Sequence, residues 1–593
     1  MKAKQLLLYL LLTAHCGLMT ATVRYVSKTG SATPPYTSWT TASDSIQKCI
    51  NICQAGDTVY VANGVYKENL VINTEIVLIG SSMDSTVIDG RGLANITIEI
   101  FEPILIENLK IFGKGNGIGA AAIYSAYQVN IRNCKISDAA LGVGCLSNLI
   151  AYNIFITKLT GGISLNSSDT VCYTISNCIM NLSNEHSNGI SIGFAENAIV
   201  YAINNIILFT GLINPRHGIY LSLPKKAYIS NNFISRFLDN IMIDGFFDTA
   251  FIKNNVLAYH ETSGATGSIY NSGGNIVANN VILSNNRIGL STPSQWPWRV
   301  KSDYNIFWQN GIDIKGISYG DSDRVADPMF VKDTIPTSAT NFDYHLQAYS
   351  PAIDRGDPNI LDVDGTRSDI GMYGGPFGEI TYYKDYAPKA PRNLSVIVDT
   401  NKVTIKWKRN TEADTSYYKV YRDTTQNFAI DSTKLIGTPA DSFLVHPPLP
   451  HGSYYYKVSC VDKQGNESKP SEEIAVNITT MNDNPMTINY YFLYQNYPNP
   501  FNPSTTIGYK LKERGYVKLM VYDIKGELVS ILVNQEQEAG YYEVEFSSKV
   551  GSLQSTISKV DNIASGIYLY RIEVIGEGNI PVYTEMRKMI LIK

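Results

Sequence analysis

An asparagine recurs along the middle of this 593-residue chain, each time inside an apolar segment that is typical of a β-strand. The repeated residues are Asn108, Asn133, Asn153, Asn177, Asn205, Asn232, Asn255, Asn280 and Asn305. Neighbours in this series lie about 25 residues apart, an interval found in solenoid proteins, where similar turns stack along one axis. We therefore interpret each interval as one coil of a stack.

The segments around these asparagines alternate apolar and polar residues with the period of two that a strand shows and a helix does not. Examples are Ile104–Ile111, Val129–Ile136, Ile199–Leu208, Tyr228–Ile234 and Ile252–Leu257. A second short strand is expected about ten residues further on, in Gly162–Leu165, Gly189–Ile192, Gly218–Leu221, Asn240–Ile243 and Ser268–Tyr270. Two or three strands in every coil predict a parallel β-helix.

Stacked coils lie about 4.8 Å apart, so buried asparagines in register can hydrogen-bond to their equivalents above and below. The residue after each asparagine is apolar in every coil, which predicts an inward stack that fills the core. Its members are Leu109, Cys134, Ile154, Cys178, Ile206, Phe233, Val256, Val281 and Ile306. Cys134 and Cys178 are accordingly expected to act as packing residues.

The composition argues against two classes of protein. The net charge is −4 and no lysine-arginine run occurs, so no nucleic-acid partner is expected. The eight cysteines are too few for a disulfide framework. Cys49 and Cys53 lie in Ser45–Cys53, which is predicted to be a short helix, and neither a bridge nor a structural metal is expected there.

Residues 1–21 have the layout of a removable secretory signal peptide. Lys2 and Lys4 precede the apolar run Leu6–Leu12, and small residues follow. A lipoprotein anchored through Cys16 is the weaker alternative, because His15 is not the small residue that such a site needs. No other segment is long and apolar enough for a membrane span. The protein is predicted to be secreted or attached to the cell surface at the outer membrane.

The coils are flanked by recognisable ends, with Arg24–Ser27, Ala55–Val61 and Gly64–Glu68 at the start. The turn-rich residues 327–371 at the finish are expected to cap the exposed end of the stack. These ends and the repeat resemble the right-handed parallel β-helix proteins of the pectate-lyase-like superfamily over about residues 24–380. The resemblance implies a β-helix over residues 22–386 with a groove for an extracellular polysaccharide on an outward face.

After a proline-bearing linker at Ala387–Pro391, alternating strands are predicted at Val403–Trp407, Tyr417–Arg422 and Ser453–Val461. This pattern, with Trp407 on an early strand, resembles a fibronectin type III domain over residues 387–480. Such domains commonly serve as spacers or binding modules.

The last part of the chain carries Tyr497–Pro503, Val521–Gly526, Gly540, Tyr541 and Ser565–Tyr568, followed by the terminal Lys588–Lys593. Residues 488–593 thereby resemble the type A C-terminal sorting domain of the type IX secretion system. The resemblance implies the type IX secretion machinery as a partner, while a plain sandwich without a sorting role is the alternative. The predicted fold class is thus all-β, a right-handed parallel β-helix solenoid followed by two β-sandwich domains.

Polar residues gather just before the second strand of consecutive coils, and they are the candidate catalytic residues. They are Glu185, His186, Arg216, His217 and Asp239. In register, they would form one column with spacings of about 5 to 10 Å and would supply a base, an acid and a cation. The alternative is a set of solvated loop residues.

Exposed aromatic rings are candidates for stacking on sugars. Tyr220 and Tyr270 are predicted at outward positions two coils apart, and Trp296 and Trp298 lie in an excursion at Ser294–Arg299. The two tryptophans could equally cover the apolar side of that loop.

Asp362, Asp364 and Asp369 have an oxygen-rich spacing that suits calcium. The distal glutamate of a full calcium loop is missing, so turn formation is the alternative role for these aspartates.

Two functions follow from these observations. The first is a secreted polysaccharide-binding or polysaccharide-cleaving protein, lyase-like if it is catalytic, because no paired carboxylates typical of a hydrolase occur on adjacent coils. The second is a non-catalytic adhesin or structural rod, which the sparse charge on the coils favours.

Overall fold

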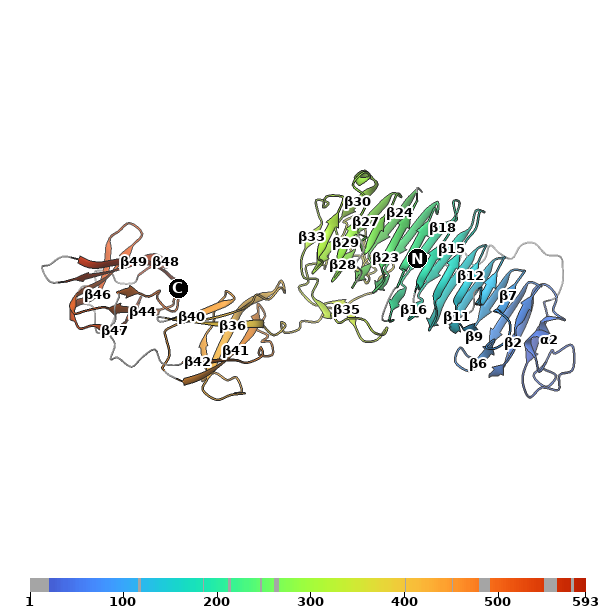
Figure 1. Ribbon diagram of the computed structural model, residues 1–593, viewed down its shortest axis with the longest axis horizontal. Helices are drawn as coiled ribbons and strands as arrows, with labels where there is room; N and C mark the ends of the chain where they lie inside the picture. The colour runs from blue at the N-terminus through green and yellow to red at the C-terminus, as the bar shows by residue number, and fades with distance from the viewer. Residues whose placement is uncertain are drawn as a thin grey trace. The chain divides into compact units, whose positions relative to one another are not determined.

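The structure is a computed structural model (Figure 1). It describes residues 21–115, 119–184, 186–211, 215–245, 248–260, 266–399, 402–450, 452–478, 491–548, 563–576 and 581–592. Most of the predicted signal peptide, residues 1–20, and Glu185 therefore lie outside the described residues. Within the described part, no helix is both long and apolar enough to cross a membrane. The chain divides into two compact units, with residues 477–593 in the second.

The first unit begins with a parallel β-solenoid of about ten turns, as the sequence predicted. Each full coil contributes strands to three faces. The first face contains β1 (Val23–Val26), β2 (Asp57–Val61), β5 (Ile76–Gly80), β8 (Ile104–Glu107), β11 (Val129–Ala139), β13 (Leu149–Thr157), β15 (Cys172–Ser176), β18 (Ile199–Ile203), β21 (Lys226–Ser230), β24 (Thr249–Lys253), β27 (Ile276–Asn279) and β30 (Val300–Asp303).

The long strands β11 and β13 continue onto the second face, where they pair with its strands. This face also contains β3 (Gly64–Tyr66), β6 (Thr86–Asp89), β9 (Lys110–Gly115), β16 (Ile179–Leu182), β19 (Ile206–Phe209), β22 (Phe233–Ser235), β25 (Val256–Ala258), β28 (Ile282–Ser284), β31 (Ile306–Trp308) and β33 (Arg324–Val325).

The third face is a separate eleven-stranded parallel sheet. Its strands are β4 (Leu70–Ile72), β7 (Ile96–Ile100), β10 (Ala121–Ser125), β12 (Leu141–Cys145), β14 (Gly161–Leu165), β17 (Asn188–Ile192), β20 (His217–Ser222), β23 (Asp239–Asp244), β26 (Ile269–Asn271), β29 (Ile288–Ser291) and β32 (Ile312–Lys315). The helical segments are α2 (Ile46–Ile50), which confirms the short helix predicted near Cys49, and the 3-10 turn η1 (Pro297–Arg299).

An asparagine makes the bend between the first and second faces in most coils. Its backbone is left-handed, with φ between 51° and 59°, at Asn108, Asn133, Asn153, Asn177, Asn204, Asn231, Asn254 and Asn280, and Tyr304 takes this position in the next coil. Asparagine tolerates this conformation better than most other residues with a side chain beyond Cβ. A bend therefore explains why the repeat is made of asparagine.

The predicted ladder mixed two structural positions, and the register corrects it. Asn205, Asn232, Asn255 and Asn305 occupy the position after the bend, and all four are completely buried. In the earlier coils that position holds Leu109, Cys134, Ile154 and Cys178, which are buried as predicted. The pattern hid the shift because two asparagines stand side by side near the bend in four of the coils, at 204–205, 231–232, 254–255 and 279–280.

The predicted hydrogen bonding between stacked asparagines is confirmed in the later coils. Asn205 donates its side-chain Nδ2 to Asn232 Oδ1 at 2.9 Å, and Asn232 donates its own Nδ2 to Asn255 Oδ1 at 3.0 Å. The backbone N–H groups of Asn205 and Asn232 bind the same two oxygens at 3.0 Å and 2.9 Å. These contacts satisfy amides that would otherwise be costly to bury.

A segment that we call the strap, residues 327–383, covers the second face from β19 to β31. It includes β34 (Phe330–Lys332) and β35 (Asp343–Leu346). Its apolar residues pack with those that the solenoid turns outward, forming a cluster of Leu208, Phe233, Val256, Ala258, Ile282, Ile306, Phe330, Tyr344, Leu346, Ala352 and Ile370. Two predictions are therefore wrong. Ile206, Phe233, Val256 and Ile306 do not point inward, and residues 327–371 cover a side of the stack rather than its end.

The bend asparagines also hold the strap. Asn231 Nδ2 donates to the Met372 carbonyl at 2.9 Å, and Asn254 Nδ2 donates to the Asp369 carbonyl at 2.9 Å. Asn280 Oδ1 accepts from the Asp357 backbone N–H at 2.7 Å. The side chains of the bend thus replace the hydrogen bonds that an irregular segment would otherwise leave unmade.

After the strap, two antiparallel sheets follow within the first unit. They contain β36 (Arg392–Asp399), β37 (Lys402–Lys408) and β40 (Phe443–His446), and β38 (Thr415–Asp423), β39 (Leu435–Gly437), β41 (Gly452–Asp462) and β42 (Ile474–Ile478). Trp407 of one sheet meets Tyr418 of the other edge-on at 5.1 Å between ring centroids. The two sheets therefore share an aromatic core. We call this part the middle sandwich.

The second unit also consists of two antiparallel sheets. They contain β43 (Phe492–Leu493), β44 (Ser504–Leu511) and β47 (Gly540–Ser547), and β45 (Gly515–Asp523), β46 (Leu528–Gln537), β48 (Gly566–Ile575) and β49 (Pro581–Leu591). One apolar cluster joins both sheets, with Ile507 from the first and Leu519 and Ile572 from the second. The all-β prediction is confirmed.

Candidate functional site

The third face presents a row of larger side chains to solvent near its middle. Ser191, Tyr220, Met242 and Tyr270 occupy equivalent outward positions in four successive strands, β17, β20, β23 and β26. Their strand neighbours, such as Ile219 on β20, point inward and are buried. The predicted outward positions of Tyr220 and Tyr270, two coils apart, agree with this register.

Hydrogen bonds connect this row from coil to coil. The Tyr220 hydroxyl donates to Asp244 Oδ2 at 3.0 Å, and the Ser272 hydroxyl donates to Asp244 Oδ1 at 2.7 Å. Burial raises the pKa of Tyr220, and the bond to the Asp244 carboxylate raises it further. Tyr220 therefore stays a neutral phenol with a fixed ring plane, which suits a stacking platform.

His217 and Asp239, two members of the predicted column, lie close together. They are register partners on β20 and β23, and His217 Nδ1 lies 3.0 Å from Asp239 Oδ2. The Asp239 side chain is buried, whereas that of His217 is 18% exposed. The ring of His217 also stacks on Tyr220 at 5.4 Å. A buried carboxylate beside a partly exposed imidazole is an arrangement used for acid–base chemistry.

His260 was not predicted and lies near Asp239. It is 2% exposed, and neither of its ring nitrogens has a hydrogen-bond partner among the described residues. Burial lowers its pKa, and the nearby Asp239 opposes that effect. No motif marks His260 in the sequence, because only the stacking of the coils brings it near Asp239.

The other predicted catalytic residues are not brought into this pair. His186 is exposed, and the residue that meets His217 from the preceding coil is Asn188, whose Oδ1 accepts from the His217 backbone N–H at 3.1 Å. The predicted column thus fails at His186, because the register partner of His217 is Asn188, two residues further along the chain. Arg216 is exposed next to His217, and Glu185 lies outside the described residues.

Trp296 and Trp298 lie at η1, after the last residue of β29. The Trp298 side chain is prominent, since the residue is 71% exposed, and Trp296 is partly buried. Trp298 therefore remains available for stacking.

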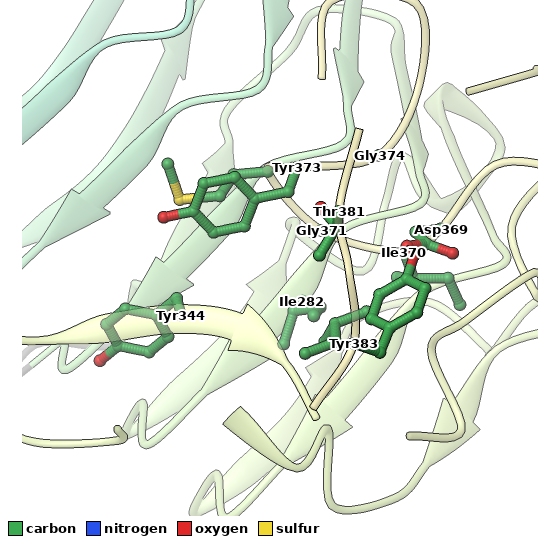
Figure 2. A pocket seen from close by; sticks show the side chains of 11 residues that line it. Ile282, Tyr344, Asp369, Ile370, Gly371, Tyr373, Gly374, Thr381 and Tyr383 are labelled. Atoms are coloured by element: carbon green, nitrogen blue, oxygen red, sulfur yellow. Dashed lines mark hydrogen bonds between the residues drawn. The ribbon is translucent and has the colours of Figure 1, made fainter. Parts of the chain in front are cut away.

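The predicted calcium ligands are engaged in local hydrogen bonds. Asp362 accepts from the backbone N–H groups of Asp369 and Gly375, and Asp364 accepts from the Thr366 backbone at 2.9 Å. Asp369 accepts from the Tyr383 hydroxyl, a contact visible in Figure 2 at the edge of a cavity of about 10 Å³. These contacts are those of the turn-forming alternative, and the three carboxylates do not converge on one point among the described residues.

The first face carries an aromatic stack that the sequence analysis missed. Tyr201, Tyr228 and Phe251 stack in successive coils, with centroids 5.0 Å and 5.2 Å apart. An open groove of about 440 Å³ lies further along this face, lined by residues that include Lys301 and Tyr319. The signal was present in the sequence as aromatic residues two places after each strand start.

No family model and no curated protein matches this chain. Among solved structures, DFA-IIIase from Arthrobacter chlorophenolicus A6 is 10% identical, covering 46% of this chain and 80% of that one with a TM-score of 0.34. An Fn3-like protein from Clostridium thermocellum is 24% identical, covering 16% and 99%, with a TM-score of 0.14. An α-L-rhamnosidase from Dictyoglumus thermophilum is 13% identical, covering 34% and 28%, with a TM-score of 0.15. At these scores, none of the three says what this chain does.

Proposed function

We propose that this protein binds an extracellular polysaccharide along the third face, across strands β17 to β26. The observation that carries the proposal is the register of Tyr220 and Tyr270, two outward rings separated by two coils, or roughly 10 Å. Aromatic faces bury the apolar faces of sugar rings, and neighbouring carboxylate and hydroxyl groups can bind sugar hydroxyls. Asp244 and Ser272 supply such groups beside the rings.

Cleavage of the bound polymer is the second candidate, and the His217–Asp239 pair favours it. In a lyase reaction, the base removes a proton beside a uronate carboxylate, the bond to the leaving sugar oxygen breaks, and a double bond forms. His217 would take the proton while Asp239 holds the imidazole, and the exposed Arg216 would bind the uronate carboxylate. A non-catalytic adhesin would use the same rings without this step.

The proposal includes export. The secretory layout of residues 1–21 and the sorting motifs at Tyr497–Pro503 and Val521–Gly526 support passage through the type IX secretion machinery to the outer surface. The separate folding unit that contains residues 477–593 is compatible with a detachable sorting domain. Cell fractionation of a chain truncated before residue 488 tests this part.

The binding test is affinity electrophoresis of the full chain against uronate and neutral polysaccharides. We expect Tyr220→Ala and Tyr270→Ala each to weaken binding of the preferred polymer at least tenfold, because a ring contact of about 1.4 kcal/mol or more is lost. Tyr201→Ala on the first face is the matched control and should bind normally. Binding that survives both third-face changes, or that is lost only in the control, would place the site elsewhere.

The same polymers should be incubated with the protein while unsaturated products and new reducing ends are followed. If the chain is a lyase, both signals rise together, and His217→Ala abolishes them while leaving electrophoretic binding in place. Reducing ends without unsaturated products would contradict the lyase chemistry. Binding with neither signal would leave polysaccharide binding as the function.

A further inference from the structure

Three aspartates meet at one edge of the middle sandwich. Asp385 lies in the segment that leads into the sandwich, Asp414 directly precedes β38, and Asp462 ends β41. One carboxylate oxygen from each lies within 4.8 Å of the other two. Asp385 is exposed, whereas Asp414 and Asp462 are buried. Three like charges at this distance repel one another unless something neutralises them.

Asp414 differs from the other buried aspartates in the described residues. Each of the others has a side-chain partner: Asp57 pairs with Arg24, Asp239 with His217, Asp327 with Lys389 and Thr411, Asp369 with Tyr383, and Asp462 with Asn466. Asp414 is 3% exposed, and its carboxylate accepts no hydrogen bond from another described residue. A buried carboxylate without a partner is costly, so its oxygens call for a ligand.

The two neighbouring carboxylates are held in place around Asp414. Asn466 Nδ2 donates to Asp385 Oδ2 and to Asp462 Oδ2, both at 2.9 Å. Asp462 Oδ1 also accepts from the backbone N–H groups of Gln464 and Asn466. No lysine or arginine forms an ion pair with any of the three carboxylates in the described part of the chain.

Protonation is the other way to relieve the repulsion. Burial raises the pKa of Asp414, and the charges of Asp462, Asp385 and Glu412 raise it further. Lys463, which follows Asp462 in the chain, donates its ammonium group to the Ala413 carbonyl at 3.1 Å. The three carboxylates therefore form an oxygen-rich group that a cation can bridge.

We propose that Asp385, Asp414 and Asp462 bind one calcium ion. Calcium is a hard cation that takes six to eight oxygen ligands at about 2.3 to 2.6 Å, and carboxylates are its preferred ligands. Small movements of three carboxylates can provide part of that shell, and backbone carbonyls and water can complete it. The ion would tie Asp385, in the entering segment, to β38 and β41. The proposal does not depend on polysaccharide binding.

Calorimetric titration of chelator-treated full-length protein with calcium chloride tests the site. We expect one calcium site in the natural chain, and at least tenfold weaker binding in Asp414→Asn. Without calcium, Asp414→Asn should melt at the same temperature as the natural chain or higher, because the change removes an unpaired buried charge. Calcium should raise the melting temperature of the natural chain but not that of Asp414→Asn.

Asp364→Asn is the matched control, since Asp364 is an exposed aspartate of the other predicted calcium group. It should bind calcium as the natural chain does. If Asp414→Asn fails to fold, Asp385→Asn replaces it, because Asp385 is exposed and its change spares the core. Three outcomes would overturn the proposal. They are no calcium uptake by the natural chain, normal calcium binding by Asp414→Asn or Asp385→Asn, and a loss of calcium binding in Asp364→Asn alone.

Discussion

The second and third faces of the solenoid contain the same kind of short parallel strand, yet one is covered and the other is open. From β19 onward, the second face turns Leu208, Phe233, Ile282 and other apolar side chains outward, and the strap covers them. The third face turns outward Ser191, Tyr220, Met242 and Tyr270, and it carries no such cover in the described residues. The side chains that point outward therefore distinguish the two faces: apolar ones are covered and stabilise the fold, whereas the polar and aromatic ones remain available to a ligand.

The largest effect should come from breaking the covered face. Phe233→Ala removes a fully buried ring that lies 4.4 Å from Phe342 and 4.6 Å from Tyr344, measured between centroids. We expect a loss of about 4 kcal/mol in the free energy of unfolding. Amide exchange across residues 327–383 should accelerate, since the strap loses the ring contacts that Phe342 and Tyr344 make with Phe233.

Phe251→Ala on the partly exposed first face is the control for this comparison. Because that ring is only partly buried, the cost should be about 1 kcal/mol, and exchange in the strap should not change. Equal losses in the free energy of unfolding from Phe233→Ala and Phe251→Ala would mean that the strap adds no stability to the face it covers.

A smaller effect is expected from the asparagine ladder behind the covered face. Asn232→Ala leaves the backbone and side-chain N–H groups of Asn205 without the Asn232 Oδ1 acceptor, and it removes the side-chain donor, one of the two donors to Asn255 Oδ1. The free energy of unfolding should fall by about 3 kcal/mol, measured by urea denaturation. Ile154→Val, at the equivalent position of an earlier coil, should cost about 1 kcal/mol. If Asn232→Ala lowers the free energy of unfolding no more than Ile154→Val does, the asparagine stack is not needed for stability.

The smallest effect concerns pH, and it should be confined to the strap. Burial raises the pKa of Asp369 to about 6, so the folded state gains stability as the pH falls through 6 and the carboxyl takes up a proton. Burial alone would lower the pKa of His345, but Glu379 and Asp343, each 2.6 Å away, raise it. The stability that protonated His345 gives the folded state is present below the usual histidine pKa, and it is lost as the pH rises through the raised pKa of His345.

Both groups therefore make the strap more stable at pH 5 than at pH 7, and Asp369 alone should contribute about 1 kcal/mol. Amide exchange of the strap at the two pH values, corrected for the intrinsic rates, measures the difference. Asp369→Asn should reduce the pH effect, while the exposed Asp364→Asn should not. Third-face amides should show no matching change, and a uniform response of the whole solenoid would contradict this assignment.

The sequence predicted the solenoid well because strand alternation and the asparagine repeat are local patterns. It also placed His217 and Asp239 in one column, and the two residues are register partners at the starts of strands in successive coils. It failed where a coil changes length: His186 stands out of register, and Asn205 was assigned to the position of Asn204. A difference of one or two residues changes which face a side chain occupies, and periodicity alone does not show where that difference falls.

By itself, the sequence determined that this protein is an all-β chain of stacked parallel coils followed by antiparallel sheets, because alternation and turn residues act over a few positions. Only the tertiary structure decided that the strap covers the second face, that His260 lies near Asp239, and that Asp385, Asp414 and Asp462 converge. These contacts join residues that are far apart in the chain. Their geometry depends on how the coils and sheets pack, and no local pattern records it.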